Sequence, residues 1–363
     1  MFEEILKNII IQNDKAIGFD EFMNLCLYHP QHGYYHSNLT KIGKKGDFIT
    51  APETSELFAK CIAKQLTEVL ENINNKNILE FGAGNGTLCL QILKNFKKKN
   101  TSLNKYYILE LSADLKNKQQ SLIKKELADL YDSVIWLNKI PVNFEGIVIA
   151  NEVVDAFPIK RFEIINGKVF ELEVNVESDN FVYQRKVTQY KPDFKYTEFK
   201  DNYIFEDNFY LKPWLQSLYK AIRSGIVLII DYGMEANEYY HREKNYGNLR
   251  CYFKHKTHKN PFINIGLQDI TAPVNFSKLY QDATSIGFNI KGYTNQAFFL
   301  INLKIDEELK NIKDEFEFIK LNQELKNLIL PNAMGEDFKV IALSKNLNVK
   351  LQGFLSNDLS HRL

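Results

Sequence analysis

The chain has 363 residues, enough for one α/β domain of roughly 200–250 residues and a substantial accessory part. Its composition, with 45% hydrophobic, 25% charged and 13% aromatic residues, is that of an ordinary globular protein. The formal net charge is +1, so charge gives no argument for an anionic membrane surface, and we expect no nucleic-acid partner.

The cysteines and the N-terminus further limit the classes of protein that this sequence can represent. The four cysteines lie far apart, and no pair has the spacing of a zinc site or a disulfide framework: Cys26, Cys61, Cys89 and Cys251. We therefore expect no metal and a reducing compartment. Residues 1–13 have the spacing of a short amphipathic helix and lack the features of a signal or transit peptide. No apolar run approaches the roughly 18 residues of a membrane span, so these patterns predict a cytoplasmic protein without membrane insertion.

Residues 1–75 are predicted to form an N-terminal helical or lid segment. Within it, residues 28–35 are aromatic and rich in turn residues, and residues 43–52 are expected to form an ordered loop. From residue 76 short apolar runs alternate with helical patterns, which predicts βαβ units and a parallel sheet that is covered on both faces. The first four strands are expected over residues 77–81, 106–109, 133–137 and 146–150.

The alternation is interrupted by two insertions, at about residues 159–210 and 232–273. In the first, residues 161–186 alternate between polar and apolar side chains around two turn signals, which predicts antiparallel hairpins. Three further strands of the main sheet are expected over residues 226–231, 288–294 and 338–343.

These elements predict an α/β fold. We expect a Rossmann-like, seven-stranded and mostly parallel sheet with helices on both faces, an N-terminal helical part and an inserted antiparallel subdomain. The main domain is expected over residues 76–345, and residues 346–363 are expected to form a C-terminal tail.

A glycine-rich loop over residues 80–86 follows the first strand and precedes a helix. Glycines let a cofactor approach the backbone, and ligands of open α/β sheets bind at the carboxyl ends of the strands. A nicotinamide site would need glycine or alanine where Thr87 stands. The Glu80 carboxylate would repel a pyrophosphate, but it suits the sulfonium and ammonium groups of S-adenosyl-L-methionine. The carboxylate of Glu110, at the end of the second strand, can accept both ribose hydroxyls.

We therefore predict S-adenosyl-L-methionine as the cofactor. The alternative is a tight turn between a strand and a helix, with Glu110 solvated at a strand end. A loop at 46–53 could cover the cofactor or only cap the helix that follows it. The residues predicted to bind the cofactor are Glu80, Gly82, Ala83, Gly84, Gly86, Glu110, Leu111, Asp47, Thr50 and Asn138.

A second group of polar residues follows the fourth strand, in the sequence Asn151-Glu152-Val-Val-Asp155. Residues at i and i+3 share one face of a helical turn, so Glu152 and Asp155 are expected to point the same way. Pro158 excludes a long helix and leaves this turn at the mouth of the pocket. We predict Glu152, Asp155 and Asn151 as catalytic residues that face the transferable methyl group. The alternative is an acidic turn that only caps the next segment.

Two weaker features remain. Asp231 ends the fifth strand and is predicted to contact cofactor or substrate at the same crevice. The histidines at 29, 32 and 36 lie on the aromatic loop, where they are expected to hydrogen-bond the loop rather than bind metal.

Nine ordered blocks between about residues 18 and 345 resemble the MidA-like family of class I methyltransferases, whose mitochondrial branch serves respiratory complex I assembly. The blocks are YHPQHGYY, GDFITAPE, ILEFGAGNGTL, ILELS, IANEVVDAFP, IIDYG, YGNLRCYFKH, QDITAPVNF and MGEDFKVIALSK. The resemblance implies a seven-stranded methyltransferase sheet with an added subdomain and S-adenosyl-L-methionine as cofactor. By similarity to the mitochondrial branch it also implies methylation of an arginine omega nitrogen on a protein partner, such as a respiratory complex I subunit. Pro273 stands where the family often carries histidine, so no side-chain role is implied there.

Two other functions fit the same sequence. A small-molecule methyltransferase would need an enclosed pocket and a local base, and the two insertions could build such a pocket or an open groove. A non-catalytic assembly factor could keep the cofactor fold, and intact Glu80, Gly82, Gly84 and Glu110 would then serve binding alone.

Overall fold

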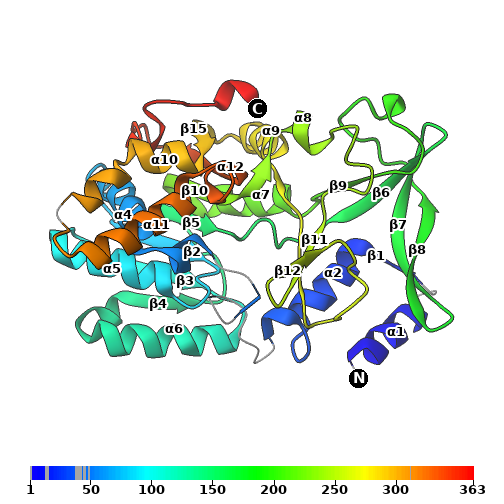
Figure 1. Ribbon diagram of the computed structural model, residues 1–363, viewed down its shortest axis with the longest axis horizontal. Helices are drawn as coiled ribbons and strands as arrows, with labels where there is room; N and C mark the ends of the chain where they lie inside the picture. Colours follow the sequence, from blue (N-terminus) through cyan, green and yellow to red (C-terminus); the bar gives the residue numbers. More distant parts are fainter. Residues whose placement is uncertain (1, 13–15, 37–42, 44–45, 48–49, 311) are drawn as a thin grey trace.

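The computed structural model describes residues 2–12, 16–36, 43, 46–47, 50–310 and 312–363. A large sheet with its helices forms one side of the molecule, and a smaller antiparallel sheet with α1 and α2 forms the other (Figure 1). Of the loop expected over residues 43–52, residues 44–45 and 48–49 lie outside the described ranges.

The main sheet has the strand order β15-β16-β10-β5-β2-β3-β4. The strands β4, β3, β2, β5 and β10 run parallel to their neighbours, and β16 is antiparallel to both β10 and β15. Their bounds are β2 Asn77–Phe81, β3 Lys105–Leu109, β4 Val134–Leu137, β5 Phe144–Asn151, β10 Ile222–Met234, β15 Asn289–Asn295 and β16 Phe338–Lys345.

An additional short strand, β14 (Val274–Asn275), pairs in parallel with the end of β10. Within the described part of the chain the sheet therefore has eight strands, and the seven predicted from the sequence were one too few. A strand of two residues is too short to produce an alternation of side chains, so the sequence pattern contains no signal for it.

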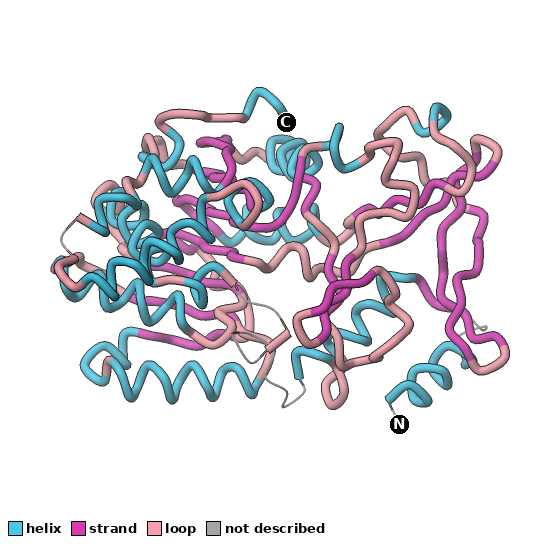
Figure 2. The backbone as a smooth tube through the Cα atoms, in the orientation of Figure 1, coloured by secondary structure: helices cyan, strands magenta, loops and turns pink. Residues whose placement is uncertain are grey.

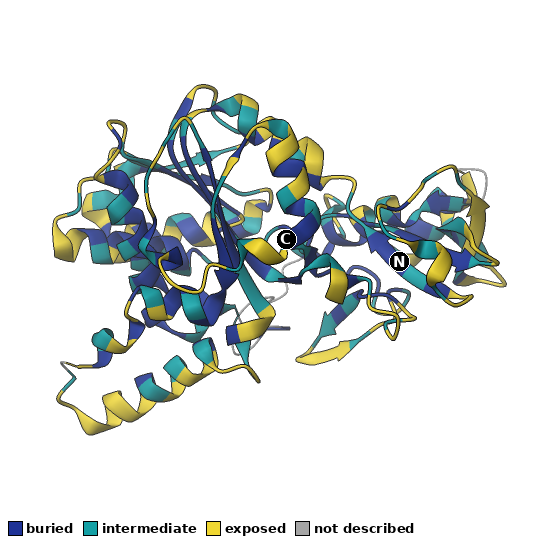
Figure 3. Ribbon diagram, turned by 90° about the horizontal axis from the view of Figure 1, so that it is seen from above, coloured by how far each residue is buried: buried dark blue, intermediate teal, exposed yellow. Residues whose placement is uncertain are grey.

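The main sheet is buried on both faces. Successive residues of a strand point to opposite faces, and Ile78 and Leu79 of β2 accordingly enter two different hydrophobic clusters. Ile78 packs in the cluster that contains side chains of α4, α5 and α6. Leu79 packs in the cluster that contains side chains of α7 and α9. Figure 3 shows the strands as a buried layer between helices whose outer surfaces are exposed.

The helices have the following bounds in chain order. They are α1 Phe2–Gln12, α2 Phe19–Tyr28, α3 Ala51–Thr54, α4 Glu56–Leu70, α5 Thr87–Lys99, α6 Ala113–Glu126, α7 Leu211–Ala221, α8 Ala236–Tyr239, α9 Phe276–Ile286, α10 Gln296–Asn302, α11 Glu315–Ile329 and α12 Met334–Asp337. Within the described ranges, every helix is too short or too polar to cross a bilayer.

The first insertion and the N-terminus build one antiparallel sheet (Figure 2), in which β7 pairs with β8 over residues 170–177, with β6 over residues 168–171 and with β1 over residues 173–175, and β9 pairs with β6. The turns at 166–167 and 178–179 have positive φ angles at both residues, as tight hairpins require. A third, smaller sheet comes from the second insertion. The bounds are β1 Ala16–Gly18, β6 Lys160–Ile165, β7 Lys168–Glu177, β8 Asn180–Val187, β9 Tyr203–Asp207, β11 Arg250–Phe253, β12 Lys256–His258 and β13 Asp269–Thr271.

The two ends of the chain pack differently from the expected segments. Residues 16–18 form β1 on the hairpin sheet, whereas α4 packs on the main sheet, so the segment 1–75 covers two regions. In the tail, Phe354 contacts Phe299 of α10 and lies in the main core. Helical spacing in a sequence shows which face of a helix is buried but not which part of the protein covers it. The packing partners of residues 1–75 and of the tail therefore could not be predicted. The division at residues 75 and 345 into folding units remains a prediction.

The pairing of β5 with β10 depends on a glycine. A Cβ at Gly225 would lie 2.0 Å from the Gly146 carbonyl oxygen of β5, and a backbone atom in a central strand cannot move away alone. We expect Gly225→Ala to lower the free energy of unfolding by about 3 kcal/mol, measured by urea denaturation. The control is Gly167→Ala, where a Cβ meets nothing within 4 Å and only the left-handed backbone costs about 1 kcal/mol. Equal losses in the two variants would contradict this packing argument.

Candidate functional site

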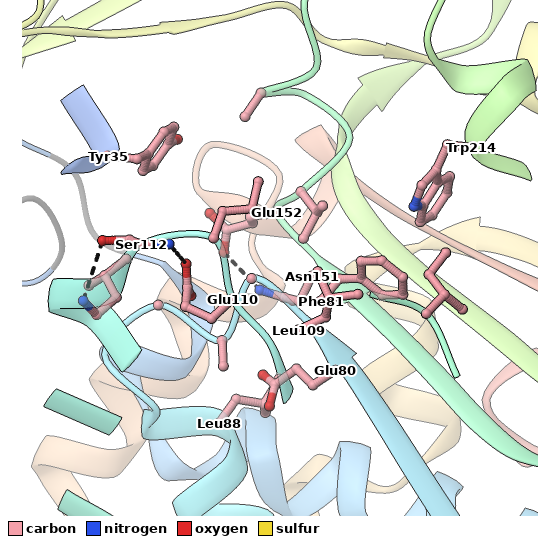
Figure 4. A pocket seen from close by; sticks show the side chains of 18 of the residues that line it. Tyr35, Glu80, Phe81, Leu88, Leu109, Glu110, Ser112, Asn151, Glu152 and Trp214 are labelled. Carbon is pink, nitrogen blue, oxygen red and sulfur yellow. Dashed lines mark hydrogen bonds between the residues drawn. The ribbon is translucent and has the colours of Figure 1, made fainter. Parts of the chain in front are cut away.

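A cavity of about 770 Å³ lies at the carboxyl ends of β2, β3, β4 and β5 (Figure 4). The sequence predicted ligands at these strand ends, and the structure brings most of the predicted residues together there. Those that line the cavity are Thr50, Glu80, Gly82, Ala83, Gly84, Glu110, Leu111, Asn138, Asn151 and Glu152. Gly86, Asp47 and Asp155 do not line it.

The glycine loop after β2 has a backbone that other residues adopt only with strain. Gly82 and Gly84 have φ angles of +58° and +54°, in the left-handed region. A Cβ at Gly82 would come within 3.3 Å of the Val153 side chain, so glycine also keeps this wall open. Gly86, with φ of +85°, is the N-cap of α5, and its amide donates to the Ala83 carbonyl. Gly86 therefore shapes the loop rather than the cavity surface.

Glu110 is held in place by its neighbours. Its Oε1 accepts the Ser112 amide at 2.9 Å, and its Oε2 accepts the Gln119 side-chain amide at 3.0 Å. Gln119 also donates to the Gly84 carbonyl at 2.8 Å, so one α6 residue ties the acid to the glycine loop. Glu80 lies at the base of the cavity, where its Oε2 accepts the Tyr106 hydroxyl at 2.8 Å and burial raises its pKa to about 7.

The loop before α4 contributes differently from the prediction. Thr50 is the N-cap of α3 and lines the cavity. Glu53 accepts hydrogen bonds from Asn85 and Thr87, at 3.2 and 2.5 Å, and so joins α3 to the glycine loop. Asp47 lies elsewhere, because its carboxylate accepts the Tyr34 hydroxyl at 2.8 Å and the backbone amide of residue 254 at 2.6 Å. The structure thus gives Asp47 a role in joining segments and places no part of it at the cavity.

The turn after β5 is not helical, contrary to the i, i+3 prediction. The Asp231 carboxylate at the end of β10 accepts the backbone amides of Val153, Val154 and Asp155, at 3.1, 2.8 and 3.3 Å. Glu152 has a left-handed backbone, with φ of +54°, and its amide donates to the Ile230 carbonyl at 2.8 Å. Such a conformation is rare for a residue with a side chain and occurs often at functional sites.

This geometry separates the two predicted carboxylates. Glu152 lines the cavity, and its Oε1 accepts from the Ala51 amide and from the Asn151 side chain, both at 3.3 Å. Asp155 is turned out of the cavity lining. The prediction that Asp231 contacts a ligand is also not supported, because its fully buried carboxylate is used by the turn and by the Tyr232 amide.

Four carboxyl groups lie close together around this turn. Two belong to the turn, Glu152 and Asp155, and two belong to other segments, Asp231 and Asp269. Burial, and after it the neighbouring Asp155, raise the pKa of Glu152 to about 8. Burial raises the pKa of Asp155 to about 7, and burial and Asp155 raise that of Asp269 to about 8. The same two causes place the pKa of Asp231 well above its ordinary value. A cation bound in the cavity would therefore stabilise the ionised forms of this cluster.

The residues at the strand ends fit S-adenosyl-L-methionine. The glycine loop lets a ligand approach the backbone, and Glu110 stands oriented at the end of β3, where a ribose can be held. The side-chain oxygen of Asn151 is buried and has no hydrogen-bond partner within the described residues, so it is available to accept from a ligand ammonium group. Leu111 supplies an exposed apolar surface at the rim.

Four residues that line or shape the cavity were not predicted from the sequence. Gln119 is one polar residue in a polar helix, and no local pattern distinguishes it. Glu53 belongs to the GDFITAPE block, and that block was the available signal. Tyr28 and Tyr35 line the cavity and belong to the aromatic segment, which was seen but given no role.

Comparisons with known proteins agree with the α/β methyltransferase fold and with S-adenosyl-L-methionine as cofactor. Residues 61–294 match the model of a family described as S-adenosyl-L-methionine-dependent methyltransferase. A solved structure of a COG1565 superfamily member from Burkholderia thailandensis, bound to S-adenosyl-homocysteine, superposes with a TM-score of 0.95 at 32% identity and covers 100% of this chain and 96% of that chain. A second, native structure from that organism gives a TM-score of 0.91 at 31% identity and covers the same shares.

Curated relatives are more distant in sequence. The protein arginine methyltransferase NDUFAF7 homolog, mitochondrial, of Drosophila melanogaster is 26% identical in an alignment of 362 positions that covers 89% of this chain and 80% of the relative. The human protein arginine methyltransferase NDUFAF7, mitochondrial, is 27% identical in an alignment of 370 positions that covers 92% of this chain and 81% of the relative.

The carboxyl cluster predicts how stability depends on pH. The folded-state pKa of Glu152, about 8, lies above its ordinary value, so its stabilising contribution is present at low pH and is lost as the pH rises through 8. We measure the free energy of unfolding of the ligand-free protein in urea at pH 6 and at pH 9. Between these two pH values we expect this free energy to fall by about 1 kcal/mol less in Glu152→Gln than in the wild type. Glu71→Gln, on the exposed end of α4, is the control and should follow the wild type. Parallel curves for Glu152→Gln and the wild type would contradict the prediction.

Proposed function

The chain belongs to the family of S-adenosyl-L-methionine-dependent methyltransferases whose model matches it, and we propose that it methylates an omega nitrogen of arginine on a protein partner. The observation that carries the proposal is the position of Glu152. Its carboxyl group lines the cavity beyond the glycine loop and is backed by three more buried carboxyls. Figure 4 shows Glu152 between Glu80 and Glu110 on one side and Tyr35 on the other.

An arginine acceptor explains why carboxyl groups gather there. The guanidinium is a planar cation with a pKa above about 12, so it is a poor nucleophile unless one nitrogen is oriented and the positive charge is drawn to the others. A carboxylate does both through charge-assisted hydrogen bonds. The names of the curated relatives, which are protein arginine methyltransferases, support the same acceptor.

The roles within the site follow from the contacts. S-adenosyl-L-methionine, when bound, supplies a methyl group activated by the neighbouring positive sulfur. Glu152 orients the acceptor nitrogen, and Asn151 holds the Glu152 carboxyl through its side-chain amide. The acceptor nitrogen gives up a proton as it gains the methyl group. A bound cation favours the ionised form of Glu152, whose pKa in the ligand-free protein is about 8, and this carboxylate takes the proton. Asp155, which lies outside the cavity lining, acts through its charge on Glu152.

The partner and the compartment are parts of the same proposal. A respiratory complex I subunit is proposed as the protein partner on the basis of the family resemblance alone. The cytoplasmic location stays a prediction from the sequence patterns.

Transfer of a radiolabelled methyl group to cell lysate, followed by separation by size, tests the proposal. A labelled protein band is the expected result. Label found only in small molecules would support a small-molecule methyltransferase instead. No label, from protein that binds S-adenosyl-homocysteine by calorimetry, would support a non-catalytic binding protein.

We expect Glu152→Gln to lower the rate of transfer by about 100-fold or more, because the variant can neither ionise nor take a proton. Its affinity for S-adenosyl-homocysteine should stay within about three-fold of wild type, since that ligand carries no guanidinium. The transfer rate and a calorimetric titration measure the two quantities. Glu71→Gln is again the control. Wild-type turnover by Glu152→Gln would remove this residue from the catalytic role.

A further inference from the structure

An aromatic wall closes the cavity on the side of the N-terminal segment. Tyr28, the last residue of α2, and Tyr35 both line the cavity and are only partly buried. Their rings stack, with centroids 5.4 Å apart and planes inclined by 20°. Tyr34 packs edge-on against Tyr35, at 5.2 Å, and is fully buried behind it. The wall therefore presents the surface of a stacked pair of rings to the same space that Glu152 faces.

Hydrogen bonds fix the orientation of both rings. The Tyr28 hydroxyl donates to the Ala156 carbonyl at 3.0 Å. The Tyr35 hydroxyl donates to both carboxylate oxygens of Asp269, at 3.1 and 3.3 Å. Each hydroxyl donates its hydrogen in a hydrogen bond within the protein. Towards the cavity, each tyrosine therefore presents oxygen lone pairs and the face of its ring, but no hydrogen-bond donor. A phenol oxygen that donates to a carboxylate is also a stronger acceptor.

Carboxyl groups lie behind this wall. Asp269 is 2% exposed, and the charged groups that raise its pKa include Asp155 and Asp47. Asp155 and Asp269 also raise the pKa of Tyr28 and Tyr35, after burial itself. An aromatic surface without donors, backed by carboxyl groups, favours a cation that is flat enough to lie against a ring.

We propose that Tyr28 and Tyr35 form the specificity wall of the acceptor site, where they hold the face of a guanidinium and select arginine over lysine, and that Asp269 is a positioning residue that holds Tyr35. This inference rests on the proposed function and names the structural basis of its substrate choice. A guanidinium stacks on an aromatic ring and bonds in its own plane, whereas a strongly hydrated ammonium loses more when it leaves water.

The test uses the full chain saturated with S-adenosyl-homocysteine. The probes are a Gly-Arg-Gly-Gly peptide and a Gly-Lys-Gly-Gly peptide, titrated to millimolar concentration by calorimetry. We expect the wild type to prefer the arginine peptide by about 10-fold, because a guanidinium can lie flat on a ring while its N–H groups bond in its own plane. Tyr35→Leu should reduce the preference to less than about three-fold, and Tyr35→Phe should keep most of it because the ring face remains. Tyr246→Leu, which removes an exposed ring outside the cavity lining, is the control.

The outcomes distinguish a failure of the aromatic wall from a failure of the proposed arginine methyltransferase function. An unchanged arginine preference in a folded Tyr35→Leu variant would overturn the wall and leave the proposed function standing. Binding of neither peptide by the wild type would also overturn the wall, whereas a preference for the lysine peptide would count against the arginine acceptor itself. If Tyr35→Leu fails to bind S-adenosyl-homocysteine, Tyr28→Leu takes its place with the same expectation.

A conservative variant tests the positioning role of Asp269. The amide oxygen of Asp269→Asn can still accept the Tyr35 hydroxyl, so this variant should keep the arginine preference. Asp269→Ala should lose it as Tyr35→Leu does, while S-adenosyl-homocysteine binds both variants as it binds the wild type. Loss of the preference in Asp269→Asn to the same extent as in Asp269→Ala would overturn the positioning role.

Discussion

The carboxylate of Asp231 accepts three consecutive backbone amides of the turn after β5, and the shape of the acceptor end of the cavity depends on this contact. Buried amides need partners, and here one side chain supplies what a helical turn would otherwise supply. With these amides satisfied, Glu152 can take its left-handed backbone and turn its side chain into the cavity. The same arrangement turns Asp155 away. One interaction between two neighbouring strands thus decides which of two similar carboxylates lines the cavity.

Charge is distributed along the cavity in a way that suits a reaction between two cations. The whole chain carries a net charge of only +1, yet Glu80 and Glu110 stand at the cofactor end and Glu152 stands at the acceptor end. Both the methyl donor and an arginine acceptor are positively charged. Two such cations repel each other in water-excluded surroundings, and carboxylates on either side offset that repulsion. Asp269 and the two cavity-lining tyrosines extend the same principle to the wall that faces the acceptor.

The sequence predicted the cofactor end well and the acceptor end poorly, for a physical reason. The strand over residues 77–81, the glycine loop and Glu110 lie in short local patterns, because an apolar run, glycines at left-handed positions and an acid at a strand end all show in consecutive residues. The contacts of Asp231 with residues 153–155 join segments about 77 residues apart. Likewise, Asp47 meets residue 254, and β1 pairs with β7. Such pairings depend on the tertiary fold and leave no local signal.

The identity of the modified amino acid tests the central claim most directly. Protein labelled by the enzyme with a radioactive methyl group can be hydrolysed to amino acids and the labelled product compared with authentic methylated standards. We expect the label in methylarginine, because a carboxyl-lined cavity with an aromatic wall fits a guanidinium. Label in methyllysine, or label released by mild base as from a carboxyl ester, would contradict it.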